Sequence, residues 1–110
     1  MSPQDELEKL KAVCPEAELW DENGKPLVYM PDCSFFAGGK SHKMDILLSP
    51  RKHDSGGYPT RLFFHKKVSE QGNWNMHSVK GRTWHACSWD NVRADQPWMD
   101  ILAAHLRSII

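Results

Sequence analysis

The sequence lacks the features that would commit a small protein to a charged polymer, an oxidising compartment or a membrane. Its 14 Lys and Arg balance 14 Asp and Glu, so no net charge steers the chain toward nucleic acid or an anionic membrane surface. Three cysteines without CxxC spacing are odd in number and do not suit a disulfide framework. No apolar run approaches the roughly 18 residues of a membrane span, and the N-terminus has no basic and apolar leader. We therefore expect a cytoplasmic protein.

Metal and nucleic-acid binding are not expected either. The histidines and cysteines show no CxxC or HxxxH pattern, and His85-x-Cys87 alone is too weak for a closed tetrahedral metal site. Lys66-Lys67 and Arg82 lie near aromatic residues, as in some proteins that bind single strands. Zero net charge and the lack of a recognisable binding motif disfavour that function. We predict no metal, no cofactor, no nucleic acid and no membrane partner.

The chain is long enough for one hydrophobic core, so we expect a single domain over residues 1–110. Ser2-Pro3, followed by apolar residues at helical spacing, predicts an N-terminal helix that Cys14-Pro15 ends. Gln96-Pro97-Trp98 opens a C-terminal helix, with Asp95 as its expected cap. Four strands of an antiparallel meander are predicted over residues 16–20, 27–30, 43–48 and 61–64, with a loop over 31–41. The predicted fold class is α+β, with helices flanking the sheet.

Residues 66–95 show little regular periodicity, yet they contain three of the five tryptophans. An irregular segment of about 30 residues inside a compact domain is usually functional or disordered, and the aromatic content argues against disorder. Within it, Cys87 lies between Trp84 and Trp89, and His85 precedes it by two residues. A thiol attacks as its thiolate, and a nearby imidazole is one way to make thiolate available near neutral pH. Cys87 is therefore a candidate nucleophile.

Several motifs around Cys87 follow one another in a definite order. Tyr58-Pro59 precedes the fourth predicted strand, and Pro97-Trp98 opens the final helix. Between them, His77 lies ten residues before Cys87, with Gly81 in between. In this order the motifs resemble the ubiquitin-conjugating (UBC) fold, specifically its small bacterial members from ubiquitin-like conjugation operons. The resemblance implies a minimal UBC-like domain with an N-terminal helix, a four-strand antiparallel meander, a long active-site loop and a C-terminal helix.

The resemblance also implies a transferase reaction. A ubiquitin-like modifier would arrive as a thioester on an activating enzyme, and Cys87 would accept it by transthiolation and pass it to an amine. His85 would serve as general base or accept the amine proton, and His77 would brace the loop by hydrogen bonds. The implied partners are the modifier, its activating enzyme and an operon-encoded deconjugating peptidase. Such operons often act in antiphage defence.

One part of the family motif is missing. Ser78 and Val79 stand where the family's His-Pro-Asn motif has Pro and Asn. That asparagine is credited with stabilising the oxyanion that forms when a lysine attacks the thioester. The loss of one such donor typically costs about 3–4 kcal/mol of transition-state stabilisation. In this chain, Asn73, Asn75 or His85 would have to supply the donor.

Two other functions remain open at this point. The first is a UBC-fold binding module without catalysis, which holds a modifier or its activating enzyme and in which Cys87 is a small buried hydrophobe. The accessibility of Cys87 separates this module from the enzyme. The second is a small redox or metal-responsive domain. Cys14, which closes a helix, and Cys33, which lies in a predicted loop, are interpreted as incidental.

Overall fold

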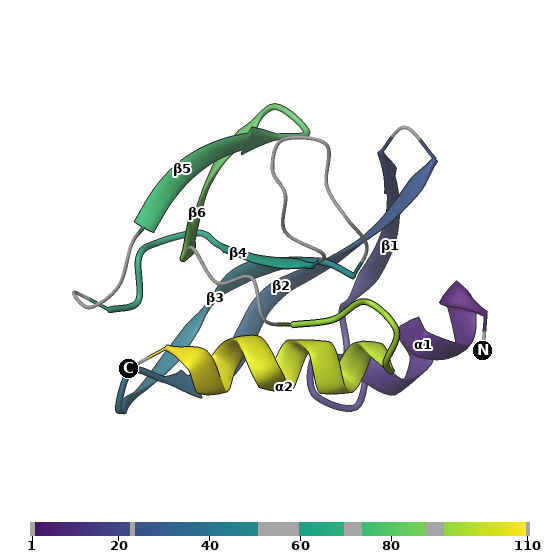
Figure 1. Cartoon of the computed structure of the whole chain (residues 1–110), viewed down its shortest axis with the longest axis horizontal. Helices are drawn as coiled ribbons and strands as arrows, with labels where there is room; N and C mark the ends of the chain where they lie inside the picture. The colour runs from purple at the N-terminus through teal and green to yellow at the C-terminus, as the bar shows by residue number, and fades with distance from the viewer. Residues whose placement is uncertain (1, 23, 51–59, 70–73, 88–91, 110) are drawn as a thin grey trace.

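The computed structural model describes residues 2–22, 24–50, 60–69, 74–87 and 92–109, which form a six-stranded antiparallel sheet with two short helices on one face (Figure 1). The elements in chain order are α1 (Pro3–Leu10), β1 (Glu18–Glu22), β2 (Lys25–Ala37), β3 (Lys40–Ser49), β4 (Arg61–Phe64), β5 (Trp74–Val79), β6 (Arg82–Cys87) and α2 (Trp98–Ser108). Neither helix of this described part is long and apolar enough to cross a membrane.

The strands lie in the order β1-β2-β3-β4-β6-β5, and each neighbouring pair is antiparallel. The order of the strands in the sheet differs from their order in the chain at one end, because β6 rather than β5 pairs with β4. β5 and β6 form a hairpin through Lys80 and Gly81, which have φ of 53° and 74°. Two residues with positive φ match the twist of a two-residue hairpin turn. This hairpin lies within residues 66–95.

The UBC-like architecture predicted from the sequence, with its four-strand meander and long active-site loop, is therefore wrong. Residues 66–95 contain two further strands of the sheet. β5 is an edge strand, and Asn75, Met76 and Ser78 on it are exposed, so its sequence shows no apolar alternation. Whether a strand lies at an edge depends on its pairing partners, which local periodicity does not reveal.

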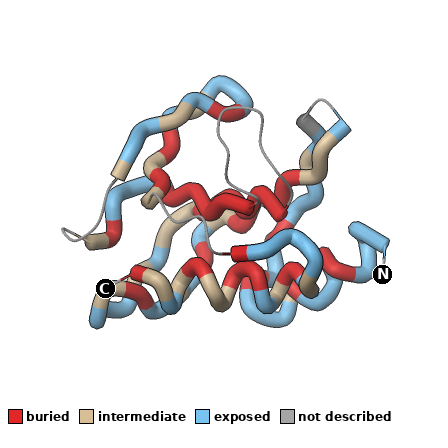
Figure 2. Tube along the Cα trace, viewed as in Figure 1, coloured by how far each residue is buried: buried red, intermediate tan, exposed pale blue. Residues whose placement is uncertain are grey.

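Each face of the sheet carries a hydrophobic cluster. Figure 2 shows where the buried residues lie along the chain. The face packed against α1 and α2, here called the helix face, carries the larger cluster. Its sheet members include Val28, Met30, Ile46, Leu48, Leu62 and Phe64. The opposite face carries Leu27, Leu47, Phe63, Val79, Trp84 and Ala86. Alternate residues of a strand point to opposite faces, so burial on both sides makes β4 buried at every position.

β2 is longer than predicted because it contains a bulge at which the strand bends without ending. Two of its residues, Pro31 and Asp32, lie opposite the single residue Asp45 of β3. Asp32 has a φ of 53°, and its amide N–H donates to Asp45 Oδ1 at 2.7 Å. The strand then continues to Ala37. The loop predicted over residues 31–41 is thus wrong.

The Asp45 carboxylate joins this bulge to the β5–β6 hairpin. Its Oδ2 accepts hydrogen bonds from the Tyr29 hydroxyl at 3.1 Å and from Arg82 Nη2 at 2.8 Å. The Arg82 guanidinium carbon lies 4.4 Å from the ring centroid of Trp84, a cation–π distance. Burial alone would raise the pKa of Asp45, but hydrogen bonds from the Asp32 amide, Arg82 and Tyr29 lower it. The carboxylate is therefore charged and fully engaged at neutral pH.

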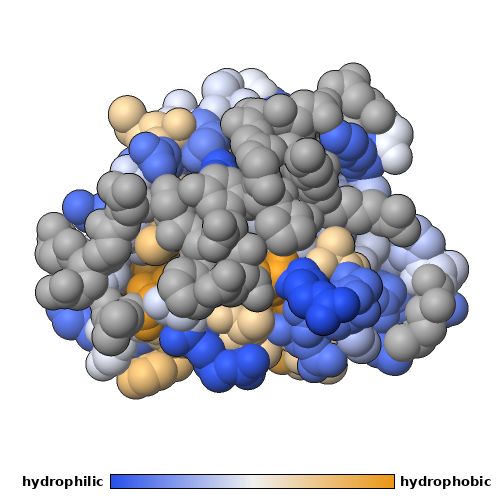
Figure 3. Space-filling model, viewed as in Figure 1, coloured by the Kyte–Doolittle hydropathy of each residue, from blue (hydrophilic) through white to orange (hydrophobic). Residues whose placement is uncertain are grey.

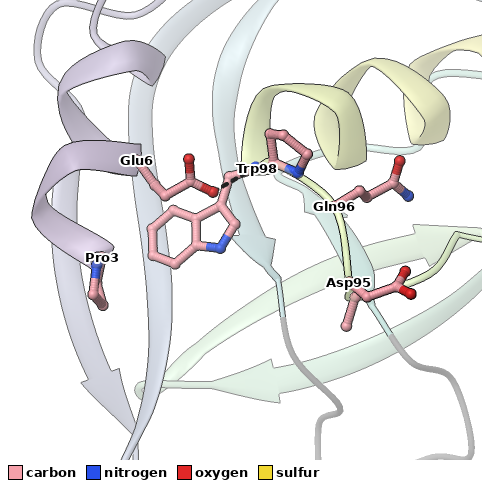
Figure 4. Close-up of a pocket in the computed structure, with 7 residues that line it drawn as sticks. Pro3, Glu6, Asp95, Gln96 and Trp98 are labelled. Atoms are coloured by element: carbon pink, nitrogen blue, oxygen red, sulfur yellow. Dashed lines mark hydrogen bonds between the residues drawn. The ribbon is translucent and has the colours of Figure 1, made fainter. Parts of the chain in front are cut away.

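The first turn of α2 depends on a residue of α1. Pro97 at the N-cap makes no side-chain cap, and the predicted cap, Asp95, instead pairs with Arg93. The Trp98 N–H donates to Glu6 Oε2 at 2.9 Å (Figure 4). A carboxylate at a helix N-terminus satisfies an orphan amide and is favoured by the helix dipole. Glu6 therefore supplies the capping interaction for α2 and ties the two helices together.

We expect Glu6→Ala to lower the free energy of unfolding by about 1–2 kcal/mol, because it leaves the buried Trp98 amide without its acceptor. Glu8→Ala is the matched control on the same helix, since Glu8 makes only exposed contacts with Gln4 and Lys11. It should cost about 0.5 kcal/mol or less. Urea unfolding of both variants measures the difference. Equal losses in the two variants would contradict the capping role of Glu6.

Candidate functional site

Cys87 is the last residue of β6, and its Cα partner on β5 is Trp74. It is partly exposed, whereas Cys14 and Cys33 are both buried. Burial raises the pKa of both the Cys14 and the Cys33 thiols, that of Cys33 to about 12. Of the three cysteines, Cys87 is therefore the one available to a reagent from solution.

His85 lies on the same face of the sheet as Cys87. Trp84 and Ala86 belong to the cluster on the opposite face, so the alternation of β6 directs His85 and Cys87 to the helix face. The Cα partner of His85 on β4 is Phe64, a helix-face residue. Two residues along a strand span about 6–7 Å. No hydrogen bond joins the two side chains in the part of the chain that the structure describes, so they are neighbours and not a bonded pair.

His77 and Asn75 lie on the opposite face. Their Cα partners on β6 are Trp84 and Ala86, respectively. The His77 ring contacts the edge of Phe63 and lies 2.7 Å from Arg61, measured between its Nε2 and the guanidinium Nη1. Asn75 is exposed.

The four predicted site residues therefore form two pairs on opposite sides of the sheet, with only His85 beside Cys87. His77 is tied to β4 by the Arg61 contact and is itself a strand residue, whereas the sequence had placed it in a loop. Asn73, Trp89 and Tyr58-Pro59, which entered the sequence argument, lie outside the described residues.

A second histidine, His105 of α2, also lies beside Cys87. Both residues line a small space, together with Leu62, Phe64, Ser108 and Ile109. The space is too small for a water molecule. The sequence already indicated that His105 is buried, because this residue occupies an apolar position of the predicted C-terminal helix. A polar residue on a buried helix face needs an internal partner.

That partner is Thr60. The Thr60 hydroxyl donates to the Val92 carbonyl at 2.9 Å and lies 2.8 Å from His105 Nε2. Because the hydroxyl has one hydrogen, which goes to Val92, Nε2 must carry a proton and donate to Thr60 Oγ1. Burial, helped by the positive charge of Arg61, lowers the pKa of His105 to about 4. His105 is thus a neutral hydrogen-bond donor at pH 7 and not a base for the thiol.

A second feature with binding potential is an apolar groove between α2 and the far end of β2. Its volume is about 250 Å³. The lining residues are Val13, Cys33, Ser34, Phe35, Phe36, Ile46, Met99, Leu102, Ala103 and Leu106. Phe36 is 65% exposed and Val13 is 44% exposed, so apolar side chains reach the surface at the groove. On the face viewed in Figure 3, small apolar patches lie next to hydrophilic side chains.

A third hollow, between α1 and the segment before α2, is open and has a volume of about 330 Å³ (Figure 4). Its polar lining includes Glu6, which already caps α2. No group of three or more metal-ligating side chains occurs among the described residues. Of the features in the described part of the chain, the Cys87 region is the one that combines a partly exposed thiol with a nearby imidazole.

Comparison with known proteins adds no relative to this picture. No family model matches the chain, and neither curated proteins nor solved structures match it. The class that the coordinates define is a six-stranded antiparallel α+β protein with a partly exposed cysteine at the end of an inner strand.

We expect stability to fall as the pH drops from about 6.5 to 4, because His105 is neutral in the folded protein and must be desolvated if charged. The unfolded chain binds this proton near pH 6.5 and the folded chain near pH 4, so the contribution is complete above 6.5 and declines below it. The loss from this residue is at most about 3 kcal/mol. Asp45, whose pKa is lowered, contributes only at still lower pH.

Urea titrations at pH 7, 6, 5 and 4 measure this dependence. His105→Gln keeps an N–H donor for Thr60 but does not titrate, so its stability should change less across the interval than that of the wild type. Parallel curves for the two proteins would show that His105 is not the group responsible.

Proposed function

We propose that this protein is a transferase that carries a ubiquitin-like modifier as a thioester on Cys87 and passes it to an amine acceptor. The exposure of Cys87 supports the proposal most directly, since the other two cysteines are buried. The proposal does not depend on a UBC-like fold. It requires a reachable sulfur, a nearby group able to take a proton, and surfaces for the modifier and the activating enzyme.

The chemistry is an exchange of thioesters followed by aminolysis. The Cys87 thiolate attacks the carbonyl carbon of the modifier's C-terminal thioester, a tetrahedral intermediate forms, and the activating enzyme's sulfur leaves as a thiolate. In the second step an amine attacks the same carbonyl, loses a proton, and releases the Cys87 sulfur. Both thioesters have similar free energy, so the site need not activate sulfur strongly.

The packing around Cys87 determines where the acyl group can lie. Towards α2, the space beside Cys87 is closed by His105, Ser108 and Ile109 and cannot hold even water. The modifier's carboxyl terminus must therefore approach from the solvent side of the strand end. An acyl group held outside the core stays open to an incoming amine, as the second step requires.

His85 is the residue we assign to proton transfer. It shares the helix face with Cys87 and is partly exposed, and imidazole can accept a proton near neutral pH. Asn75 and His77 lie on the other side of the sheet, so they take no part in this mechanism. The hydrogen bond to the oxyanion must then come from His85 or from backbone amides near the strand end.

We expect a thiol-sensitive adduct on Cys87 when the protein is incubated with a ubiquitin-like modifier, its activating enzyme and ATP. Cys87→Ser should give a thiol-resistant ester or no adduct. His85→Ala should slow discharge of the thioester to a free amine by about 100-fold while leaving its formation largely intact. Asn75→Ala, an exposed polar change on the opposite face, is the matched control and should discharge at the wild-type rate.

An equal effect of His85→Ala and Asn75→Ala would remove the role given to His85. If the wild type forms no adduct under conditions in which the activating enzyme is loaded, the transferase proposal fails.

Selective reactivity of Cys87 can be tested without any partner. In the native protein, iodoacetamide should alkylate Cys87 at least about 100-fold faster than Cys14 or Cys33, because the buried thiols react only after local opening. In denaturant the three rates should converge. Peptide mass spectrometry over a time course gives each rate. Similar native rates at all three positions would mean that Cys87 is not the exposed thiol.

A binding module without catalysis is the second candidate, and the apolar groove beside α2 favours it. A groove of about 250 Å³ with exposed Phe36 and Val13 offers apolar surface that a protein partner can cover. In this case the modifier or activating enzyme would bind the wild type and Cys87→Ser equally well, and no covalent adduct would appear. The adduct assay thus separates the two candidates.

A further inference from the structure

Cys14 and Cys33 are distant in sequence but lie together in the helix-face core. Cys14 closes the turn after α1, where its amide N–H donates to the Leu10 carbonyl at 3.0 Å. Its Sγ lies 3.4 Å from the carbonyl oxygen of Pro31, two residues before Cys33. Both cysteines belong to the same buried cluster, and each thiol shifts the pKa of the other through a side-chain interaction, so the two side chains are neighbours.

The bulge in β2 brings Cys33 close to Cys14. The extra residue at Pro31-Asp32 shifts the register of β2 against β3, so that Met30 and Cys33 both belong to the helix-face cluster although they are three positions apart. Without the bulge, residues 30 and 33 of a regular strand would point to opposite faces. The positive φ of Asp32 and its bond to Asp45 hold this geometry.

The pair is close to solvent even though both thiols are buried. Cys33 lines the apolar groove beside α2, and Val13, the residue before Cys14, lines it as well. A peroxide that enters the groove therefore meets Cys33 first, whereas a larger reagent such as iodoacetamide reaches the buried thiols only after local opening.

We propose that Cys14 and Cys33 are a redox modification site, at which a peroxide converts the two thiols into an intramolecular disulfide. One sulfur, as its thiolate, attacks a peroxide oxygen and becomes a sulfenic acid, while the O–O bond breaks and the departing oxygen leaves as water. The second sulfur attacks the first, the S–O bond breaks, and the hydroxide takes the second thiol's proton as water. Two thiols and one hydrogen peroxide thus give one disulfide and two waters.

The disulfide would fix the turn after α1 to the bulge of β2, along one wall of the apolar groove. In the reduced protein this turn is held by the contacts described above and by packing alone. Raised thiol pKa values keep both groups protonated at neutral pH, so the reaction should be slow there and faster at higher pH.

The test uses the full chain with Cys87→Ser, so that the exposed thiol takes no part. After treatment with hydrogen peroxide, removal of the peroxide and denaturation, iodoacetamide should alkylate neither Cys14 nor Cys33. The intact mass should fall by two hydrogens, and a proteolytic digest should contain one peptide that links the two cysteines. Dithiothreitol should restore both thiols, and the oxidised protein should melt at a higher temperature than the reduced one.

Cys33→Ala in the same background is the control and should show no loss of two hydrogens. The digest of the wild-type protein provides a second measurement that does not depend on whether the control variant folds. The proposal is overturned if both thiols remain alkylatable after peroxide treatment, or if the linked peptides come from two molecules. Because Cys87 is absent from the test protein, its result is independent of the transferase proposal.

Discussion

The Asp45 carboxylate connects three parts of the sheet that are far apart in the sequence. One oxygen holds the amide of Asp32 at the bulge of β2, and the other accepts from Tyr29 and from Arg82 of β6. A partly buried carboxylate is costly to desolvate, and here the cost is offset because donors surround it. Removing it would leave the Asp32 amide at the bulge without this acceptor and the Arg82 guanidinium without its carboxylate partner.

Two consequences for chemistry follow from this arrangement. The bulge shifts the register of β2 and directs Cys33 toward Cys14, which creates the thiol pair under the helices. The bond to Arg82, together with the packing of Trp84, fixes β6 beside β4. That position sets the side of the sheet from which the Cys87 sulfur can be reached.

The residues of α2 that lie beside Cys87 limit what this cysteine can do. His105 is nearby, but it is neutral and committed to Thr60, so it supports the shape of the site and does not act as a base. His85 remains as the imidazole on the same face with partial exposure. Cys87 is thus partly exposed, and the space between it and α2 is too small for a water molecule.

Local sequence was enough to place both helices. Ser2 caps α1 as expected, with Asp5 N–H donating to its hydroxyl. These are properties of neighbouring residues, and short-range periodicity and capping chemistry report them.

The strand count, the partners of each strand and the face on which each side chain lies followed from long-range pairing. The resemblance to the UBC family grouped His77 with Cys87 through the spacing of its motif, and Asn75 as a replacement for the missing asparagine. In the β5–β6 hairpin they pair with Trp84 and Ala86 instead, which puts them on the far side of the sheet. Register decides the face of every strand residue, and register depends on partners that a single sequence does not display.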